Sequence, residues 1–402
     1  MDKDFELKGT VLMKYTGPGG DIAVPEGVTD ISEDAFHTSP YGDESITGIY
    51  LPEGVVRIAQ GAFRDCHRLN RIHLPDSLRE IGGKHMRGAF EHCDSLRSIR
   101  IPGGVTVLPD YMFDSCENLR EVFLPNSLWK IGVAAFYRCH LLEFVRLPEK
   151  LEVIDIYAFS QCTSLVDIRI PNSVRELGNS AFLGCPRLSH VVLPEGILKI
   201  GLTTFRGCTS LRELRIPDSV RELGFAAFEN CTSLESIRIP EGVTVLGNYL
   251  FNGCTSLRTL EIPENVTKIQ DNTFEDCTDL EEITIPAAVT EIGAEAFLNC
   301  SGLETVRILG KNVKISASAF HGTGAEIIVD SLPLGKLPRD ARENTLRAFA
   351  RRVADGEDIP EGHRAQCMKY IRRAGAKLTP LAMTEPALME LLRNEHLLDE
   401  EA

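Results

Sequence analysis

The residues most able to do chemistry in this chain of 402 residues are its 12 cysteines, because a thiolate can bind metal or act as a nucleophile. Zinc motifs need pairs such as C-x-x-C within one loop, and the sequence contains none. Each regularly spaced cysteine instead comes three residues after a phenylalanine, which indicates a small inward-facing residue. We expect buried, reduced, structural thiols, which suit a reducing compartment. The first gap between them is 27 residues and every later gap is 23, at Cys66, Cys93, Cys116, Cys139, Cys162, Cys185, Cys208, Cys231, Cys254, Cys277 and Cys300.

Histidine is the second residue type that could build a site. Four of the ten histidines lie close together in the sequence: His67, His73, His85 and His92. Two or three imidazoles from adjacent coils could hold a metal ion. No i, i+4 pair and no supporting carboxylate pattern is present, so we favour solvated turn histidines and expect no metal or other cofactor.

Catalytic motifs are absent. The sequence lacks a phosphate-binding G-x-x-x-x-G-K-[ST] loop, H-E-x-x-H, G-x-S-x-G and the dinucleotide-binding fingerprint. Cys367 has no catalytic signature around it. We therefore expect that the chain is not an enzyme.

The elements that position these residues follow from a 23-residue repeat. In the unit of residues 217–239, Leu234-x-x-Ile237-x-Ile239 predicts a short strand closed by a proline. Val220 and Leu223 predict a second short extended piece, and Ala227-Phe228 predicts a tight, single-turn helical corner. One unit cannot bury its apolar groups alone, so the units must stack into a solenoid. The repeated phenylalanines predict about thirteen coils, marked by Phe36, Phe63, Phe90, Phe113, Phe136, Phe159, Phe182, Phe205, Phe228, Phe251, Phe274, Phe297 and Phe320.

The ends of the repeat predict a three-part organisation. Residues 1–19 contain a β-hairpin cap, residues 20–329 form the solenoid, and residues 330–402 form an α-helical cap or a small separate interaction module. Four-residue insertions around 40–43 and 83–86 interrupt turns. In the last part, an apolar i, i+3, i+7 pattern ends at Gly356, and a second helix is expected over residues 361–374. Thr379-Pro380 and Thr384-Glu385-Pro386 resemble capped helix starts.

The repeat resembles a known family. Leu193 to Ile216 follows the unit L-P-x-x-[VL]-x-x-I-G-x-x-A-F-x-x-C-x-x-L-x-x-I-x-I, with Thr204-Phe205 for Ala-Phe, and this unit is typical of the BspA-like (Treponema-type) leucine-rich repeat family. The resemblance covers about residues 20–329. It implies an α/β solenoid, right-handed, with a parallel β-sheet on its concave face. It also implies protein binding or adhesion, often at bacterial surfaces.

One strand face carries an unusual column of side chains. The residue between the two inward apolar positions is arginine in six of eleven coils of an acidic protein. These arginines either pair with carboxylates of the neighbouring column or form a contact surface for a partner. Phe123, Phe144 and Val192 are apolar where other coils are polar. Our candidate partner-binding residues are Arg100, Phe123, Phe144, Arg146, Arg169, His190, Val192, Arg215 and Arg238.

Charge and hydropathy narrow the partners. The net charge is −15, and residues 331–402 are balanced, with 12 basic and 12 acidic residues, so the excess lies in the first 330 residues. That surface repels phosphate backbones, and we expect no nucleic-acid partner. No long uncharged apolar run predicts a membrane span, and the first six residues do not resemble a secretory signal. We expect a cytoplasmic scaffold or recognition module with a protein or peptide ligand, the alternative being a surface adhesin whose signal was removed. The oligomeric state stays open.

Overall fold

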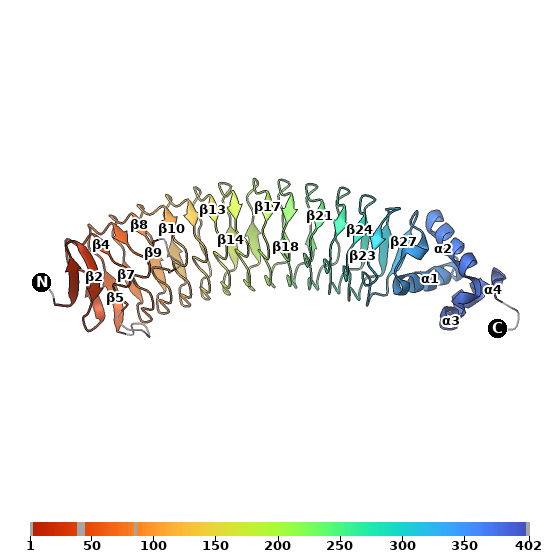
Figure 1. Cartoon of the computed structure of the whole chain (residues 1–402), viewed down its shortest axis with the longest axis horizontal. Helices are drawn as coiled ribbons and strands as arrows, with labels where there is room; N and C mark the ends of the chain where they lie inside the picture. Colours follow the sequence, from red (N-terminus) through yellow and green to blue (C-terminus); the bar gives the residue numbers. More distant parts are fainter. Residues whose placement is uncertain (1–2, 38–44, 84–86, 399–402) are drawn as a thin grey trace. The chain divides into compact units, whose positions relative to one another are not determined.

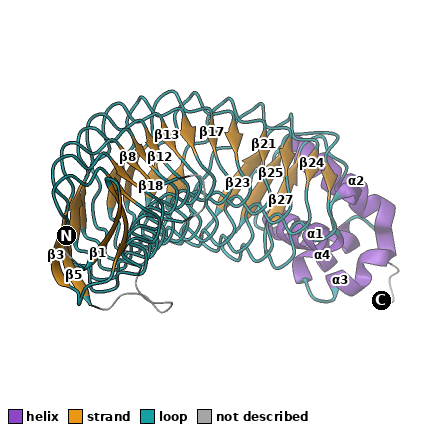
Figure 2. Cartoon of the chain, turned by 60° about the vertical axis from the view of Figure 1, so that its left-hand side comes forward, coloured by secondary structure: helices purple, strands orange, loops and turns teal. Residues whose placement is uncertain are grey.

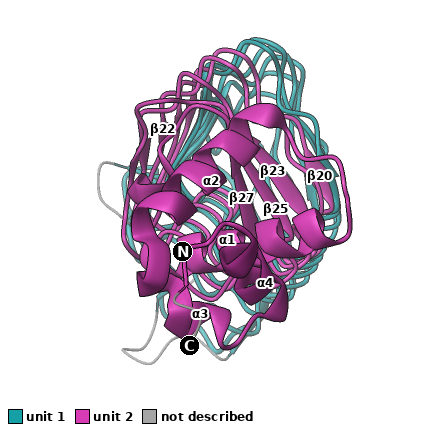
Figure 3. Cartoon of the chain, turned by 90° about the vertical axis from the view of Figure 1, so that its right-hand side faces the viewer, with its two compact units in different colours: residues 1–220 teal, residues 221–402 magenta. Residues whose placement is uncertain are grey.

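The computed structural model describes residues 3–37, 45–83 and 87–398, so His85 and most of both insertions lie outside the described residues. The chain divides into two compact units, residues 1–220 and 221–402 (Figure 3). Each unit consists of short parallel strands that follow one another coil by coil (Figure 1). The predicted fold, a parallel solenoid of about thirteen 23-residue coils with helices at its C-terminal end, is confirmed.

Most coils of the first unit contribute two short strands, as the two apolar runs of the repeat predict. The sheet carrying the candidate residues contains β3 (Gly20–Ala23), β5 (Ile46–Tyr50), β7 (Arg71–His73), β9 (Ser98–Arg100), β11 (Glu121–Phe123), β14 (Asp167–Arg169), β16 (His190–Val192) and β18 (Glu213–Leu214). The second series contains β4 (Asp30–Ile31), β6 (Arg57–Ile58), β8 (Glu80–Ile81), β10 (Val107–Leu108), β12 (Lys130–Ile131), β13 (Val153–Ile154), β15 (Glu176–Leu177) and β17 (Lys199–Ile200).

The second unit repeats the pattern and adds helices. Its first strand series contains β20 (Ser236–Ile237), β23 (Glu282–Ile285), β25 (Thr305–Ile308) and β27 (Glu326–Val329). Its second series contains β19 (Glu222–Leu223), β21 (Val245–Leu246), β22 (Lys268–Ile269), β24 (Glu291–Ile292) and β26 (Lys314–Ile315). The helices are η1 (Leu334–Lys336), α1 (Arg339–Ala354), α2 (Glu361–Ala374), η2 (Gly375–Leu378), α3 (Thr379–Ala382) and α4 (Pro386–Asn394).

A column of buried phenylalanine rings fills the core of each unit. From Phe36 to Phe205, the centroids of the stacked neighbouring rings lie 5.0 to 5.7 Å apart. From Phe228 to Phe320 they lie 5.1 to 5.6 Å apart. Rings in this stacked, close-packed arrangement contribute contact energy beyond the apolar area that they bury.

The cysteines line this core and make a second contribution that the sequence pattern did not predict. All 12 are free and buried, so the prediction of structural thiols is confirmed. The Cys116 thiol donates a hydrogen bond to the Phe90 carbonyl, at 3.0 Å, and the same bond recurs in most later coils. The thiol therefore satisfies a buried backbone oxygen that a purely apolar residue would leave unpaired.

The corner after the second strand is not helical, and our prediction of a single-turn helix there was wrong. In the coil quoted above, Ala226 and Asn230 have left-handed backbones, with φ of 52° and 59°. Such residues interrupt the repeating right-handed conformation that an α-helix requires. The corner is a series of turns instead, closed by bonds such as Cys231 N–H to the Phe228 carbonyl at 3.1 Å.

The N-terminal hairpin adjoins the first coil through its second strand. β1 (Phe5–Lys8) pairs antiparallel with β2 (Val11–Tyr15), and β2 pairs parallel with β4. The Tyr15 ring lies 5.8 Å from the Phe36 ring and continues the aromatic column to its N-terminal end. The hairpin thereby covers the end of the core of the first unit.

Helices α1 and α2 lie against β27 at the other end of the chain (Figure 2). Ile327 N–H donates to Thr345 Oγ1 of α1 at 3.0 Å, and Val329 N–H donates to His363 Nδ1 of α2 at 3.2 Å. These side chains satisfy donors that the free edge of a strand would otherwise leave exposed. The range predicted for the second helix, residues 361–374, is confirmed.

The two proline-containing helix starts are also present, but without the threonine caps that we expected. Proline lies in the first turn of α3 and of α4. Thr379 and Thr384 donate to preceding carbonyls, those of Ala376 and Leu381, and neither caps a helix. Proline removes one of the N–H groups that a cap would satisfy, so these starts depend less on a side-chain acceptor.

Candidate partner-binding surface

The candidate residues lie on the solvent face of the first strand series of each unit. In the paired strands β9 and β11, Arg100 is the partner of Phe123, and in β14 and β16, Arg169 is the partner of Val192. Phe144 forms an isolated bridge opposite Asp167. The alternation of the strands therefore places these side chains outward, as the sequence predicted.

The strongest feature of this face is a hollow of about 520 Å³ around Phe144. Phe144, Arg146 and Arg169 line it together, with Asp167 and Glu149. The Phe144 side chain is 61% exposed, which is unusual for an aromatic ring without a partner. The hollow therefore offers an apolar ring beside two guanidinium groups.

Phe123 belongs to a different hollow, of about 370 Å³, which it lines with Arg100. The ring is 51% exposed, and Val192 is 50% exposed. Within the described part of the chain, Phe123 and Phe144 make no ring contact with each other. The structure therefore forms two neighbouring aromatic–arginine sites where the sequence suggested one aromatic pair.

The arginines of the column differ in their partners. Arg215 Nη1 lies 2.6 Å from Glu195 Oε1, so this guanidinium pairs with a carboxylate of a turn and not of the neighbouring column. For Arg146 and Arg169, the described residues provide no ion pair within 4 Å. His190 is exposed, and its Nδ1 lies 3.0 Å from Ser189 Oγ. Arg238 is exposed in the second unit.

The first coils extend the same face with a cluster that the sequence analysis missed. Tyr50 is half exposed, and its ring stacks on His73 with centroids 4.8 Å apart. Arg71 pairs with Asp21 in the same hollow of about 400 Å³. The signal was available, because Tyr50 lies 23 residues before His73, but the column was read only from His73 onward.

A second apolar surface, also missed, lies over the other strand series of the first unit. Leu198 is 64% exposed, and it lines a hollow of about 480 Å³ with Ile156. Trp129 precedes β12 in this series and is 42% exposed, so it does not belong to the arginine face. Reading the column one residue before each of these strands would have revealed Trp129 and Leu198 together.

The histidines do not form a joint site. His67 Nδ1 lies 2.7 Å from Asp94, His73 stacks on Tyr50, and His92 lies beside Glu91. Among residues 3–37, 45–83 and 87–398, no group of three or more histidine, cysteine or acidic side chains is placed to hold a metal ion. No described helix is long and apolar enough to cross a membrane.

One buried cluster in the second unit contains the types of a catalytic triad: Cys367, His363 and Glu326. Because Val329 N–H donates to His363 Nδ1, the imidazole proton is on Nε2, which donates to Glu326 Oε1 at 3.2 Å. Cys367 Sγ lies 3.7 Å from the same Nε2. Burial raises the pKa of the Cys367 thiol, and both Cys367 and His363 are fully buried. A protonated thiol without access for a substrate is a poor nucleophile, so the cluster is structural.

Fold and surface together define a leucine-rich repeat solenoid whose exposed features are suited to contact and not to catalysis. The model of the BspA type leucine rich repeat region matches six copies here, over residues 29–147, 130–224 and 199–326. The chain belongs to this family. Its members are typically protein-binding or adhesin-like and are generally non-enzymatic scaffolds.

Solved structures agree with this assignment. A leucine-rich repeat protein from Bacteroides ovatus is 29% identical, with a TM-score of 0.63, over 78% of this chain and 87% of that one. A leucine-rich repeat protein from Eubacterium ventriosum is 22% identical, with a TM-score of 0.52, over 78% of this chain and 88% of that one, and it supports the fold alone. A search of the curated proteins gave no match.

Proposed function

We propose that this chain is a recognition module that binds a protein or peptide through the sheet face around Phe144. The observation that carries the proposal is the hollow of about 520 Å³ in which an exposed ring, Phe144, lies beside Arg146 and Arg169. Aromatic residues and arginine are enriched among the side chains that dominate binding energy at protein interfaces. Clustered exposed apolar groups are otherwise uncommon on a soluble surface.

The chemistry of the hollow defines the ligand. Arg146 and Arg169 can each bind a carboxylate through two parallel N–H donors. Phe144 offers a face for an aromatic or aliphatic side chain. The preferred segment therefore carries an acidic residue next to an apolar one. Phe123 with Arg100 provides a second site of the same composition one coil earlier.

The proposed role is non-catalytic. The family supports it, since its members generally act as scaffolds. The buried cluster around Cys367 supports it as well, because its thiol is held protonated beneath the surface. A standard panel of hydrolase and transferase substrates should give no turnover with the purified chain.

We further propose that the chain acts in the cytoplasm. The 12 buried, reduced thiols support this location, because a reducing compartment preserves them. Fractionation of the native cells, with antibody detection of the chain, tests it. Recovery of the chain at the cell surface would favour the alternative role of an adhesin for proteins of a host or neighbouring cell.

The binding face can be tested by site-specific crosslinking. A photoreactive phenylalanine analogue at position 144 should capture the ligand in cells, whereas the same analogue at position 284, the equivalent column in the second unit, should not. The captured protein is then purified and titrated against Phe144→Ser/Arg146→Glu, which should bind at least about tenfold more weakly if two charge-assisted contacts are lost.

The matched control is Thr284→Ser/Arg307→Glu, which makes the same charge change in the same column of the second unit. It should bind like the unmodified chain. Equal weakening by both variants, or capture at position 284 alone, would move the binding site away from Phe144. Both variants must retain the unmodified circular dichroism spectrum.

A further inference from the structure

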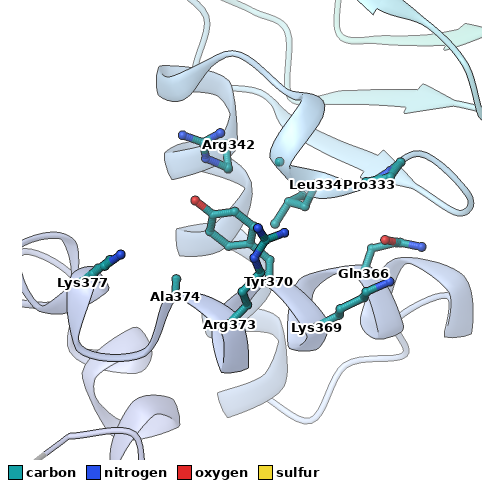
Figure 4. Close-up of a pocket in the computed structure, with 10 residues that line it drawn as sticks. Pro333, Leu334, Arg342, Gln366, Lys369, Tyr370, Arg373, Ala374 and Lys377 are labelled. Carbon is teal, nitrogen blue, oxygen red and sulfur yellow. The ribbon is translucent and has the colours of Figure 1, made fainter.

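A second hollow, of about 430 Å³, lies among the C-terminal helices and beyond the family match, which ends at residue 326 (Figure 4). Its size is typical of small-molecule sites. Residues of η1, α1, α2 and η2 line it: Pro333, Leu334, Gly335, Arg342, Gln366, Lys369, Tyr370, Arg373, Ala374 and Lys377.

The sequence builds this hollow from one face of α2. Gln366, Lys369, Tyr370 and Arg373 recur at spacings of three and four residues, which brings them to the same side of a helix. Arg342 comes from α1 and Lys377 follows α2 in η2, and both side chains line the same space (Figure 4). Four of the ten lining residues are therefore cationic, and none is acidic.

Arg342 is held in place without using its charge. Its guanidinium carbon lies 5.3 Å from the centroid of the Tyr370 ring, and its Nη1 donates to the Leu337 carbonyl at 3.3 Å. A cation over an aromatic face is attracted by the ring but is not neutralised by it. The geometry fixes a positive group at the wall of the hollow before any ligand arrives.

Other arginines of the same helices have carboxylate partners. Arg351 pairs with Glu385, Arg352 Nη1 lies 3.2 Å from Glu326, and Arg372 Nε lies 2.9 Å from Glu395. Within the described residues, the four cations of the hollow have no such partner. Arg372 and Arg373 are neighbours in sequence, yet only the one that faces away from the hollow is paired.

We infer that this hollow binds a small ligand that carries several phosphate groups. Four cations converge on it without a counterion, and the mutual repulsion of like charges is relieved most by a compact anion of high charge. Arginine and lysine side chains are the usual protein ligands of phosphate. Gln366 and the Tyr370 hydroxyl could bind the uncharged part of such a ligand by hydrogen bonds.

The inference is independent of the proposed face at Phe144. It assigns a second role to the helices that cover the edge of β27, and it explains why an acidic protein has a locally basic surface at this end. Arg342 and Tyr370 supply preorganisation, whereas Lys369, Arg373 and Lys377 supply charge.

Isothermal titration of the full chain with tripolyphosphate, at fixed ionic strength, tests the inference. We expect one site per chain. Lys369→Glu/Arg373→Glu should weaken binding at least about tenfold, because each charge-assisted contact contributes roughly 1.5–3 kcal/mol. The control Arg364→Glu/Arg393→Glu makes the same charge change at exposed positions that do not line the hollow and should bind normally.

No binding of tripolyphosphate by the unmodified chain at millimolar concentration would overturn the inference. Equal weakening by both variants would also overturn it, because it would indicate general charge attraction and not a site. Tyr370→Ala offers a second measurement: loss of the ring that holds Arg342 should weaken tripolyphosphate binding while the net charge is unchanged. Unchanged affinity in that variant would contradict the assigned geometry.

Discussion

The coils of the first unit and the helices of the second are held together by different interactions. Each coil buries an aromatic ring against its neighbours and pairs its backbone through short parallel strands. Helices α1 and α2 join β27 through a few specific polar contacts, with Glu326, His363 and Arg352 at their centre. The coils therefore distribute their stability over many similar contacts, whereas the attachment of the helices depends on a small cluster that no other residues replace.

The largest expected effect is the loss of one ring from the coils. Phe205 is fully buried and stacks on Phe182 at 5.7 Å. Phe205→Ala should lower the free energy of unfolding by about 3–5 kcal/mol, as for other buried aromatic residues. Urea denaturation followed by circular dichroism measures it. Phe123→Ala, which removes a half-exposed ring, is the matched control and should cost far less. An unchanged midpoint for Phe205→Ala would refute the assignment of the core.

A smaller effect is expected where the helices meet β27. Burial raises the pKa of Glu326, but the hydrogen bond with His363 and the charge of Arg352 outweigh it and leave that pKa below its ordinary value of 4.5. The stabilisation is therefore fully present above about pH 4.5 and is lost as the pH falls through the lowered folded value. Glu326→Gln should cost about 1–3 kcal/mol at neutral pH.

The measurement for Glu326→Gln is hydrogen exchange of α1 and α2, compared with that of the coils. Exchange should accelerate in the helices alone, and its dependence on acid pH should flatten. Glu357→Gln is the control, because Glu357 also pairs with Arg352, at 3.0 Å, but is 54% exposed. Equal acceleration in both variants would mean that the buried cluster does not hold the helices.

The difference between the two regions also decides what could be predicted from the sequence. Phenylalanine, cysteine and proline recur every 23 residues, so the coils, the buried thiols and the outward column could all be predicted. The helix bounds followed from apolar spacing and proline. The pairing of His363 with the edge of β27 could not be predicted, because it joins residues 34 positions apart in a non-repeating segment. Likewise, the hollow around Tyr370 requires the packing of α1 against α2, which no periodicity specifies.

The smallest effect concerns the order in which thiols become reactive. Burial raises the pKa of Cys185 to about 12, and raises that of Cys367 as well. In the native state at pH 8, a disulfide reagent such as Ellman's should therefore react with none of the 12 cysteines. In mild denaturant, Cys367 should react before the cysteines of the coils, because opening α2 breaks only the polar cluster, whereas opening a coil breaks stacked rings on both sides. Mass spectrometry of the labelled peptides identifies the first site. Glu326→Gln should advance the reaction of Cys367 and leave the others unchanged. Earlier labelling of a coil cysteine would mean that the aromatic column is the weaker of the two attachments.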